Sequence, residues 1–229
     1  MLYLVSDLHG EYNLFLKLLD KIKFSIKDQM IVCGDIIDKG PDSVKLAKFI
    51  FSQSNVQCIL GNHEYEFLKV YWGLMKNTSN NFDGVLKELQ EYFPNDGYLL
   101  DWDTVDKIES LPIYIETEDF ICVHAGIPLD NKNVPLPLSC ITVEQVVYDR
   151  YFKSPDLIPN YNKCVVFGHT PVRYLSGKDE VIFYPRANNA TRIRDFFKIH
   201  LDMGTMLSGK VACLCVDTMQ VYYVEKSSS

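Results

Sequence analysis

The sequence predicts an α/β fold in which two mixed β-sheets pack face to face with helices outside. Short apolar runs of strand type alternate with helical patterns over the first third of the chain. Strand-type runs return after residue 112, and the chain closes with an alternating run typical of a hairpin. Strand–helix alternation is typical of a parallel sheet covered by helices, whereas a hairpin adds antiparallel strands. The 229 residues are enough for a single domain with its own core.

The first third is expected to contain three strands and three helices. The strands are predicted at residues 2–6, 30–33 and 56–60, and the helices at residues 11–21, 42–52 and 63–76. Leu14, Leu18 and Leu19 lie at helical spacing within the first helix. Pro41 is expected in the first turn of the second helix, where its missing N–H has no partner to lose.

The remainder of the chain is less regular. Further strands are predicted at residues 113–115, 120–123 and 164–167, with a short helix at 142–150 and a hairpin at 211–224. The first two of these strands would pair through the acidic turn at 116–119, and the hairpin would turn near 217–220. Residues 77–112 are helical in pattern and polar on one side, so we expect a helical, cap-like region there.

Residues 181–199 have the pattern of an insertion before the final strands. The segment contains Arg186, Arg192 and Arg194, so one interpretation is a basic substrate flap. The alternative is a solvated loop, since connecting segments commonly lie on the surface and vary in length.

Composition excludes some classes of function. The net charge of −7 argues against sequence-blind binding of nucleic acid, which depends on many Lys and Arg contacts to phosphates. An anionic substrate remains compatible, because bound metal ions can invert the local field. No apolar run is long enough for a membrane span, and the N-terminal run lacks the features of a signal peptide. Seven cysteines, mostly inside apolar runs, indicate buried reduced thiols in a cytoplasmic protein.

Polar side chains follow five of the expected strands, at the point where each strand ends. They occur as Asp7 and His9, Asp35 and Asp38, Asn62 and His63, then His124, and then His169. Open α/β sheets assemble their sites at the carboxyl ends of strands. Glycines beside each motif allow the backbone to turn sharply and to approach a ligand closely.

The residue types in these motifs favour a metal centre. Carboxylate, imidazole and amide ligands together suit Mn²⁺, Fe or Zn²⁺ better than Mg²⁺ or Ca²⁺, and the lack of thiols argues against a structural zinc site. Six candidate ligands exceed what one ion needs and suit two ions that share a carboxylate. The six are Asp7, His9, Asp35, Asn62, His124 and His169.

Each of these residues has a structural alternative when it is taken alone. Asp7 could cap the helix that follows it, and His124 and His169 could be core histidines. The set is harder to explain in this way, because four of the five histidines lie in motifs at strand ends. The fifth, His200, fits no ligand position and is expected to be structural.

The motifs as a set resemble those of the calcineurin-like metallophosphoesterases. Five blocks occur in the order of that family, namely Asp7-Leu8-His9, Gly34-Asp35-Ile36-Ile37-Asp38-Lys39-Gly40, Gly61-Asn62-His63-Glu64, His124-Ala125-Gly126 and Gly168-His169-Thr170-Pro171. Two further similarities are Val146-Val147-Tyr148-Asp149-Arg150 and Leu201-Asp202-Met203-Gly204. The pattern is most similar to the phosphoprotein phosphatase branch, with its bacterial and bacteriophage Ser/Thr protein phosphatases. The resemblance implies one four-layer α/β/β/α domain over residues 1–229.

The resemblance also assigns the metal ligands. Asp7 and His9 would bind one ion, and Asp35 would bridge it to a second ion. Asn62, His124 and His169 would complete the second site. The family's chemistry implies that a hydroxide held between two divalent ions, of which manganese is the first choice, attacks phosphorus in line.

The resemblance implies further roles outside the metal shell. His63 would protonate the leaving oxygen, oriented by Asp38. Arg150 would grip the phosphoryl oxygens with its planar fork, and Asn62 could also donate to the phosphate. Lys39 would bind substrate, although the family usually has Arg there and Lys provides only a point charge.

Three functions remain after this comparison. A protein Ser/Thr phosphatase is favoured by Asp38 and Glu64, because dinucleoside tetraphosphate hydrolases often lack the first acid and have Asp for the second. The alternative is such a dinucleoside tetraphosphate (Ap4A-type) or other nucleotide hydrolase, which also fits the run from His124 to Pro128. A non-catalytic metal-binding module would not need His63 or Arg150. The partner is therefore expected to be a phosphorylated protein or peptide, or else a small phosphate ester or nucleotide.

Overall fold

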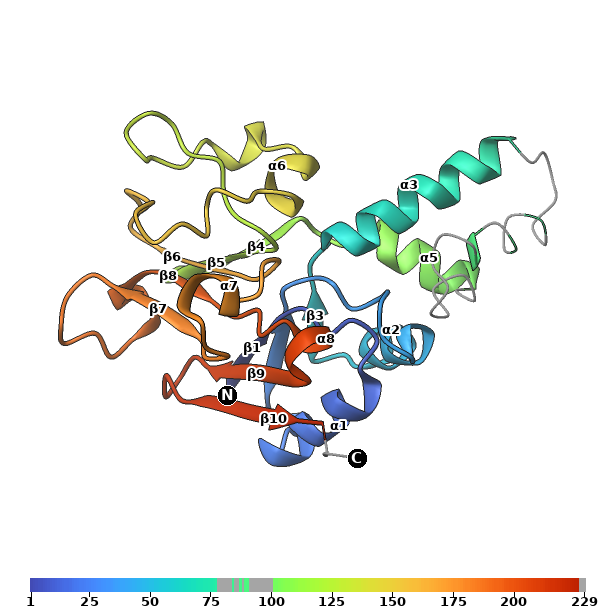
Figure 1. Ribbon diagram of the computed structural model, residues 1–229, viewed down its shortest axis with the longest axis horizontal. Helices are drawn as coiled ribbons and strands as arrows, with labels where there is room; N and C mark the ends of the chain where they lie inside the picture. The colour runs from blue at the N-terminus through green and yellow to red at the C-terminus, as the bar shows by residue number, and fades with distance from the viewer. Residues whose placement is uncertain (78–83, 85–86, 88, 91–100, 227–229) are drawn as a thin grey trace.

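The computed structural model describes residues 1–77, 84, 87, 89–90 and 101–226. Two mixed five-stranded β-sheets form its centre (Figure 1). The strand orders are β10-β9-β1-β2-β3 in the first sheet and β4-β5-β6-β8-β7 in the second. The predicted fold class is confirmed.

The first sheet is built on the parallel strands that the N-terminal third predicts. β1 (Leu2–Val5) pairs with β2 (Gln29–Val32), which pairs with β3 (Val56–Cys58). On the other side of β1 the antiparallel hairpin of β9 (Lys210–Cys215) and β10 (Val221–Glu225) completes the sheet. The predicted closing hairpin is thus confirmed, and it carries the end of the chain back beside its beginning.

The second sheet combines one antiparallel pair at each edge with parallel pairing inside. β4 (Tyr114–Glu116) pairs antiparallel with β5 (Phe120–Val123), as the acidic turn predicts. β5 then pairs in parallel with β6 (Cys164–Phe167), and β6 with β8 (Phe196–His200). β7 (Ile182–Pro185) closes the far edge, antiparallel to β8.

Alternating side chains of the central strands supply separate cores. In β1, Leu4 faces a cluster between the sheets, whereas Tyr3 and Val5 belong to the cluster under the helices. In β5, Cys122 enters the cluster between the sheets and Ile121 faces the outer side of the second sheet. This two-residue period is the expected pattern for a strand buried on both faces.

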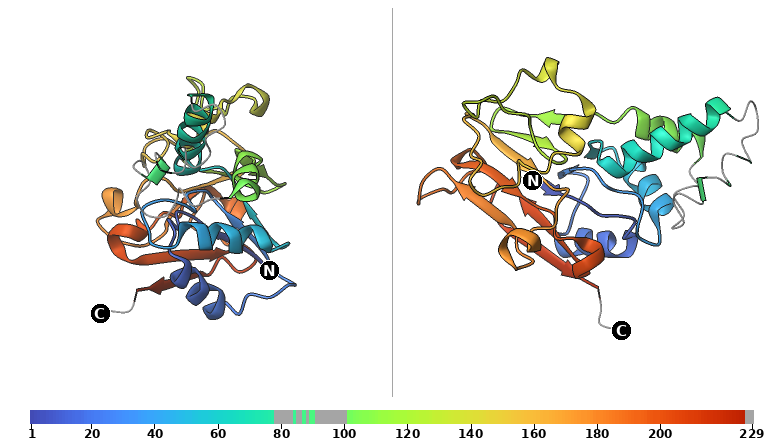
Figure 2. Two further views of the ribbon diagram at one scale, coloured as in Figure 1. Left: turned by 90° about the vertical axis from the view of Figure 1, so that its right-hand side faces the viewer. Right: turned by 45° about the horizontal axis from the view of Figure 1, so that its top comes forward.

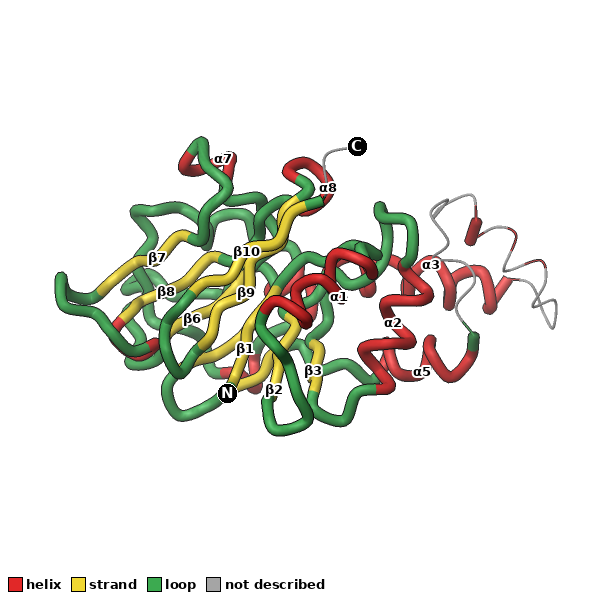
Figure 3. Tube along the Cα trace, turned by 90° about the horizontal axis from the view of Figure 1, so that it is seen from below, coloured by secondary structure: helices red, strands yellow, loops and turns green. Residues whose placement is uncertain are grey.

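Helices cover the outer face of the first sheet. α1 (Tyr12–Lys21) and α2 (Ser43–Ser52) lie across it (Figure 3). α3 (Asn62–Asn77) and α5 (Trp102–Glu109) extend to one side of the sheets (Figures 1 and 2). The last part of the region 77–112 contains the helix α5. Most of residues 78–100 lie outside the described residues, so the cap-like role of the region stays a prediction.

The outer face of the second sheet is covered by shorter elements. These are the 3₁₀ turn η2 (Leu138–Cys140) and α6 (Val143–Val147), with Phe152 packed against the sheet. The predicted helix at 142–150 is therefore only five residues long, and Arg150 lies in the turn that follows it. Gln145 Oε1 accepts from Thr142 N at 2.9 Å, which fixes the start of α6.

The start of α2 also differs from the prediction. Asp42 is the N-cap and the helix begins at Ser43, so Pro41 precedes the helix instead of lying in its first turn. The backbone N–H of Asp42 donates to Gly10 O at 3.0 Å, an interaction with the loop after β1.

The interpretation of residues 181–199 as an insertion was wrong. The segment contains β7, the 3₁₀ turn η3 (Ile193–Asp195) and most of β8, and β8 lies inside the second sheet. Arg186 Nη2 donates to the carbonyls of Tyr161 at 2.7 Å and Lys163 at 3.0 Å, so its guanidinium holds the sheet edge and is not part of a flap.

The structure tests two predictions, that the cysteines are buried reduced thiols and that no segment spans a membrane. None of the seven cysteines, all of which lie in the described part of the chain, forms a disulfide. Six are buried as predicted, but Cys140 is exposed in η2. Among the described residues no helix is both long and apolar enough to cross a membrane.

Candidate active site

The strand-end motifs of both sheets meet at one place. Asp7 and His9 follow β1, and Asp35 and Asp38 follow β2, all in the first sheet. His124 follows β5 and His169 follows β6 in the second sheet, and Asn62 and His63 begin α3. The backbone N–H of His169 lies 3.2 Å and 3.1 Å from the two carboxylate oxygens of Asp7, which joins the two sheets directly.

The loops that carry these residues have an unusual backbone. Asp7, His9, Asp35, Asp38 and His169 all have positive φ, between 44° and 70°. Non-glycine residues rarely adopt this region, and such strain clusters at functional sites. Backbone hydrogen bonds stabilise the conformation, since His9 N donates to Asp35 O at 2.8 Å and so ties the first loop to the second.

The side chain of Glu64 holds the loop after β2 in place through hydrogen bonds. Its buried carboxylate accepts four backbone N–H groups, from Asp35 and Ile36 at 2.8 Å and from Ile37 and Gly61 at 3.0 Å. A Cβ atom at Gly61 would lie 2.2 Å from Asp35 Oδ1, so only glycine allows this close approach. The sequence analysis used Glu64 only as part of a family motif and did not predict that it would hold this loop.

Asp35 lies at the centre of the site. Its Oδ2 is 3.6 Å from His9 Nε2 and 3.9 Å from His63 Nε2, and its Oδ1 is 3.4 Å from His124 Nε2. Two groups of possible ligand atoms result, one formed by His9, Asp35 and His63 and the other by Asp35, His124 and His169. Asp35 belongs to both groups, which is the arrangement that the sequence predicts for a bridging carboxylate.

The amide oxygen of Asn62 belongs with the second group. It lies 2.9 Å from His124 Nε2 and 2.8 Å from His169 Nδ1. Asp7, the remaining predicted ligand, contacts His169 N and accepts a hydrogen bond from Ser6 Oγ. The structure therefore brings the six predicted ligands together, although His63 takes the place of Asp7 in the first group of ligand atoms.

The hydrogen-bonding partners of His124 show that a proton or a cation lies next to its Nε2 atom. His124 Nδ1 lies 2.8 Å from Cys33 O and must donate to it, so the Nε2 atom faces the oxygens of Asp35 and Asn62. Burial alone would lower the pKa of His124, but the Asp35 and Asp7 carboxylates raise it to about 10. A proton or a metal ion must therefore lie among these acceptors.

His9 and His169 are neutral in this environment. Burial lowers the pKa of His9 to about 4 and that of His169 to about 3. His169 Nε2 is buried without a hydrogen-bond partner among the described residues. Although burial opposes its ionisation, the His124 and His63 rings hold the pKa of Asp35 well below its usual range. Neutral imidazoles beside an ionised carboxylate are the protonation state that metal binding requires.

His63 has two different neighbours at its two nitrogens. Its Nδ1 donates to Asp38 Oδ2 at 2.7 Å, while its Nε2 is directed toward Asp35. Despite burial, the Asp35 and Asp38 carboxylates raise the pKa of His63 above its ordinary value. The hydrogen bond to Asp38 is the one that the sequence analysis expects, and the role of His63 as a proton donor stays a prediction.

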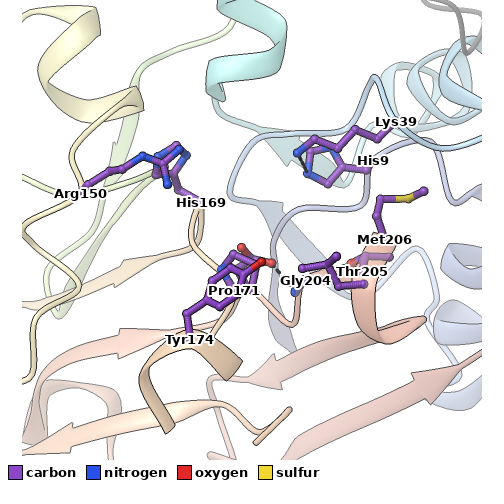
Figure 4. A pocket seen from close by; sticks show the side chains of 11 residues that line it. His9, Lys39, Arg150, His169, Pro171, Tyr174, Gly204, Thr205 and Met206 are labelled. Atoms are coloured by element: carbon purple, nitrogen blue, oxygen red, sulfur yellow. Dashed lines mark hydrogen bonds between the residues drawn. The ribbon is translucent and has the colours of Figure 1, made fainter. Parts of the chain in front are cut away.

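A pocket of about 270 Å³ opens beside the ligand groups (Figure 4). Arg150 lies next to His169 on one side of it, and Lys39 lies over His9 on the other, with Nζ 3.1 Å from His9 Nε2. The remaining lining residues are Pro171, Tyr174, Asp202, Gly204, Thr205, Met206 and Leu207. The sequence predicts both cations at the site but did not identify this wall, because four of its residues come from two helices of only four residues each and the other three from the adjoining loops.

Comparison with known families decides the class of protein. The model of the calcineurin-like phosphoesterase family matches residues 2–200. The chain belongs to the calcineurin-like phosphoesterases. The predicted resemblance is confirmed at the level of this family.

The curated relatives of this phosphoesterase are named symmetrical bis(5'-nucleosyl)-tetraphosphatases. The protein of that name from Buchnera aphidicola is 35% identical over 128 residues, covering 55% of this chain and 44% of the relative. The one from Coxiella burnetii is 28% identical over 207 residues, covering 88% and 66%. The chain thus spans less than half the length of the Buchnera relative and about two thirds of that of the Coxiella relative. Their names do not support the phosphoprotein phosphatase branch that we predicted.

Solved structures of similar fold include phosphatases of several kinds. A candidate diadenosine tetraphosphatase superimposes with a TM-score of 0.70 at 18% identity, over 100% of this chain and 94% of the other. A Saccharomyces cerevisiae protein serine/threonine phosphatase gives a TM-score of 0.52 at 14% identity, over 100% and 80%. At such identities the likeness establishes only the fold.

The side chains of this phosphoesterase fit the divalent ions that the family implies. The donors are carboxylates, imidazoles and an amide, without thiols, which suits Mn²⁺, Fe or Zn²⁺. The unpartnered Nε2 of His169 and the acceptors around His124 Nε2 are each compatible with a bound cation. Two ions sharing Asp35 would meet both needs.

Proposed function

We propose that this chain is a metal-dependent phosphohydrolase that cleaves the central phosphoanhydride of a dinucleoside tetraphosphate into two nucleoside diphosphates. The observation that carries the reaction is the shared Asp35 carboxylate, which belongs to two ligand groups at the edge of a pocket containing Arg150 and Lys39. The names of the relatives support the substrate class. The alternative that the sequence left open is therefore preferred over the protein phosphatase.

Two divalent ions, of which manganese is our first choice, would be held by the six residues predicted as ligands. Asp7 and His9 would serve one ion, Asn62, His124 and His169 the other, and Asp35 both. When bound, such ions supply positive charge to the phosphoryl oxygens and lower the pKa of water.

The protein's own cations would bind the polyphosphate. Arg150 can contact two phosphoryl oxygens at once through its planar guanidinium, and Lys39 adds a point charge on the opposite side of the pocket. Their positions next to His169 and His9 place both charges beside the ligand groups (Figure 4). Asn62 contacts the two histidines of the second group and is the third polar side chain that we assign to substrate.

His63 would hold the proton for the leaving oxygen. Nδ1 is committed to Asp38, so the proton to be transferred is on Nε2. A nucleoside diphosphate is a stable anion and needs this proton less than an alkoxide does.

The same pair keeps the predicted protein phosphatase as a second candidate. A phosphoserine or phosphothreonine ester leaves as an alkoxide, which requires a general acid, and the Asp38–His63 hydrogen bond provides one. The partner would then be a phosphorylated protein or peptide. Binding to nucleic acid is not proposed, given the net charge of −7. The cytoplasmic location stays a prediction of the sequence.

A competition assay separates the two substrates. The protein is stripped of metal, Mn²⁺ is restored, and kcat/KM is measured on diadenosine tetraphosphate and on a phosphothreonine peptide. We expect at least a tenfold preference for the dinucleotide, about 1.4 kcal/mol in transition-state binding. An Asp35→Asn variant, inactive on both substrates, is the control for contaminating phosphatase. A preference for the peptide would assign the chain to the second candidate.

A further inference from the structure

The pocket beside the ligand groups has an exposed apolar wall. Tyr174 is 66% exposed and Leu207 is 59% exposed, although both are large apolar side chains. Met206 lines the same pocket and is 36% exposed, and Pro171 lines it as well (Figure 4). The Tyr174 side chain has no hydrogen bond or aromatic contact with the described residues.

The wall consists of two segments that are held together. α7 (Arg173–Ser176) follows the His169 loop, and α8 (Thr205–Ser208) follows β8. Val172 N donates to Asp202 O at 2.9 Å, which connects the two segments. Gly204 has φ 64°, and a Cβ atom there would lie 2.8 Å from Pro171 Cβ, so the backbones approach closely. The apolar side chains are therefore presented on a fixed surface.

The wall is also anchored to the predicted metal ligands. Thr205 Oγ1 donates to the carbonyl of Asp7 at 2.7 Å, and Tyr174 lies five residues after His169. Arg150 and Lys39 border the same pocket as this wall. A ligand in the pocket would meet a cation on each of two sides and also a flat aromatic ring.

We propose that Tyr174, with Pro171, Met206 and Leu207, forms the subsite that binds a nucleobase of the substrate. The inference rests on the proposed function and specifies how the site distinguishes a nucleotide from a bare polyphosphate. Every nucleobase has a flat π-face that can stack on an aromatic ring, whichever polar groups its edge carries. The ring of Tyr174 offers such a surface. An apolar peptide side chain would not need a planar partner next to the cations.

The test compares two ligands that differ only in the nucleoside. Binding of ADP and of inorganic diphosphate to the Mn²⁺-loaded protein is measured by calorimetry. We expect ADP to bind about tenfold more tightly than diphosphate, within the range of one stacked base. In Tyr174→Ala this advantage should disappear while diphosphate binding is unchanged. Tyr174→Phe should keep it, because the ring and not the hydroxyl provides the surface.

Tyr151 supplies the matched control. It is 84% exposed and lines a separate hollow that also borders Arg150. Tyr151→Ala should leave ADP binding unchanged. The proposal would be overturned if ADP binding weakened in Tyr151→Ala and not in Tyr174→Ala. Equal losses of ADP and diphosphate in Tyr174→Ala would also overturn it, because they indicate disturbed phosphate binding. Since Tyr174 is exposed, both variants should fold.

The outcome is separable from that of the proposed function. If diadenosine tetraphosphate is hydrolysed but Tyr174→Ala changes neither ADP binding nor KM, the base subsite is wrong and the function stands. If ADP binding depends on Tyr174 but the dinucleotide is not hydrolysed, the subsite stands and the substrate assignment fails.

Discussion

His63 Nδ1 and Asp38 Oδ2 are joined by a hydrogen bond of 2.7 Å at the edge of the ligand groups. The ring of His9 packs edge-on against that of His63, with the centroids 4.8 Å apart. His63 is therefore held by Asp38 on one side and by His9 on another. Its orientation is set before substrate binds, as a general acid requires.

Substitution of His63 should affect the two classes of substrate unequally. We expect His63→Asn to lower kcat on an alkyl phosphomonoester by about 10²–10⁴, the usual range for general acid catalysis. On diadenosine tetraphosphate the loss should be smaller, because the diphosphate leaving group is already a stable anion. Steady-state kinetics on both substrates measures the ratio, and Asp38→Asn should change it in the same direction. Turnover of the monoester within about tenfold of the unsubstituted protein would exclude the acid role.

The shared position of Asp35 predicts how metal content responds to substitution. We expect two Mn²⁺ ions per chain in the loaded protein, both lost in Asp35→Asn and one lost in His169→Gln. Elemental analysis after gel filtration measures the content, with far-UV circular dichroism to verify folding. Loss of one ion in Asp35→Asn would show that the carboxylate is not shared.

Lys39 occupies a position where the family usually has arginine. Its Nζ lies 3.1 Å from His9 Nε2, so the charge is on the pocket side of a predicted ligand. Lys39→Arg should change KM for a phosphate substrate by several-fold, because a fork replaces a point charge, and should leave metal content unchanged. An unchanged KM would refute a role in substrate binding.

Glu64 is expected to matter for stability more than for chemistry. Its carboxylate accepts four backbone N–H groups, and Glu64→Gln replaces one acceptor oxygen by a donor facing those groups. We expect the free energy of unfolding to fall by about 3 kcal/mol, the scale of unsatisfied buried polar groups. Urea denaturation measures it, and the exposed Glu118→Gln should change it by less than about 0.5 kcal/mol. Equal effects of the two variants would contradict the structural role.

Lys198 gives a dependence of stability on pH that is independent of the candidate metal site. Its buried Nζ donates to the carbonyls of Phe152 at 2.8 Å and of Ser154 and Leu157 at 2.7 Å. Burial lowers the pKa of Lys198 from 10.5 to about 8. Between these two values the unfolded chain binds more protons than the folded chain, so this group makes the folded state more stable as pH rises. Below pH 8 the group contributes no slope, because both states are protonated.

The measurement is the difference in unfolding free energy between the unsubstituted protein and Lys198→Met from pH 7 to 10. Above pH 8 the unfolding free energy of the unsubstituted protein should rise relative to that of Lys198→Met, by at most about 1.4 kcal/mol per pH unit. The exposed Lys178→Met is the control and should give no slope. A difference that is constant with pH would mean that the pKa of Lys198 is not lowered.

The strand-end motifs made much of the site predictable. Asp7, His9 and Asp35 follow apolar runs that can only be buried strands, and chemistry-bearing residues after such runs meet at one sheet edge. β8 was missed for a physical reason, because its central residue is Lys198, and a lysine is buried only when neighbouring carbonyls satisfy it. Tyr174 and Leu207 were missed because four-residue helices leave no periodic signal.

The prediction of a phosphoprotein phosphatase rested on Asp38 and Glu64. In the structure neither residue lies where it would contact the non-phosphate part of a substrate, since Asp38 accepts a hydrogen bond from His63 and Glu64 holds the loop after β2. Residues that maintain a reaction centre do not distinguish a peptide from a nucleotide. The substrate is distinguished by the surface around the centre, which is assembled from distant segments and has no motif.

Asp7 belongs to one sheet and His169 to the other, so the spacing of the reactive groups is set by the thickness of the core between the sheets. Packed sheets are separated by roughly 10 Å, and close-packed interiors transmit small changes of volume. A buried side chain in this core, such as Ile199, thus helps to set the separation of the two halves of the reaction centre. Enlarging or shrinking such a side chain would shift one half of the centre against the other, and activity would decline while the chain is still folded.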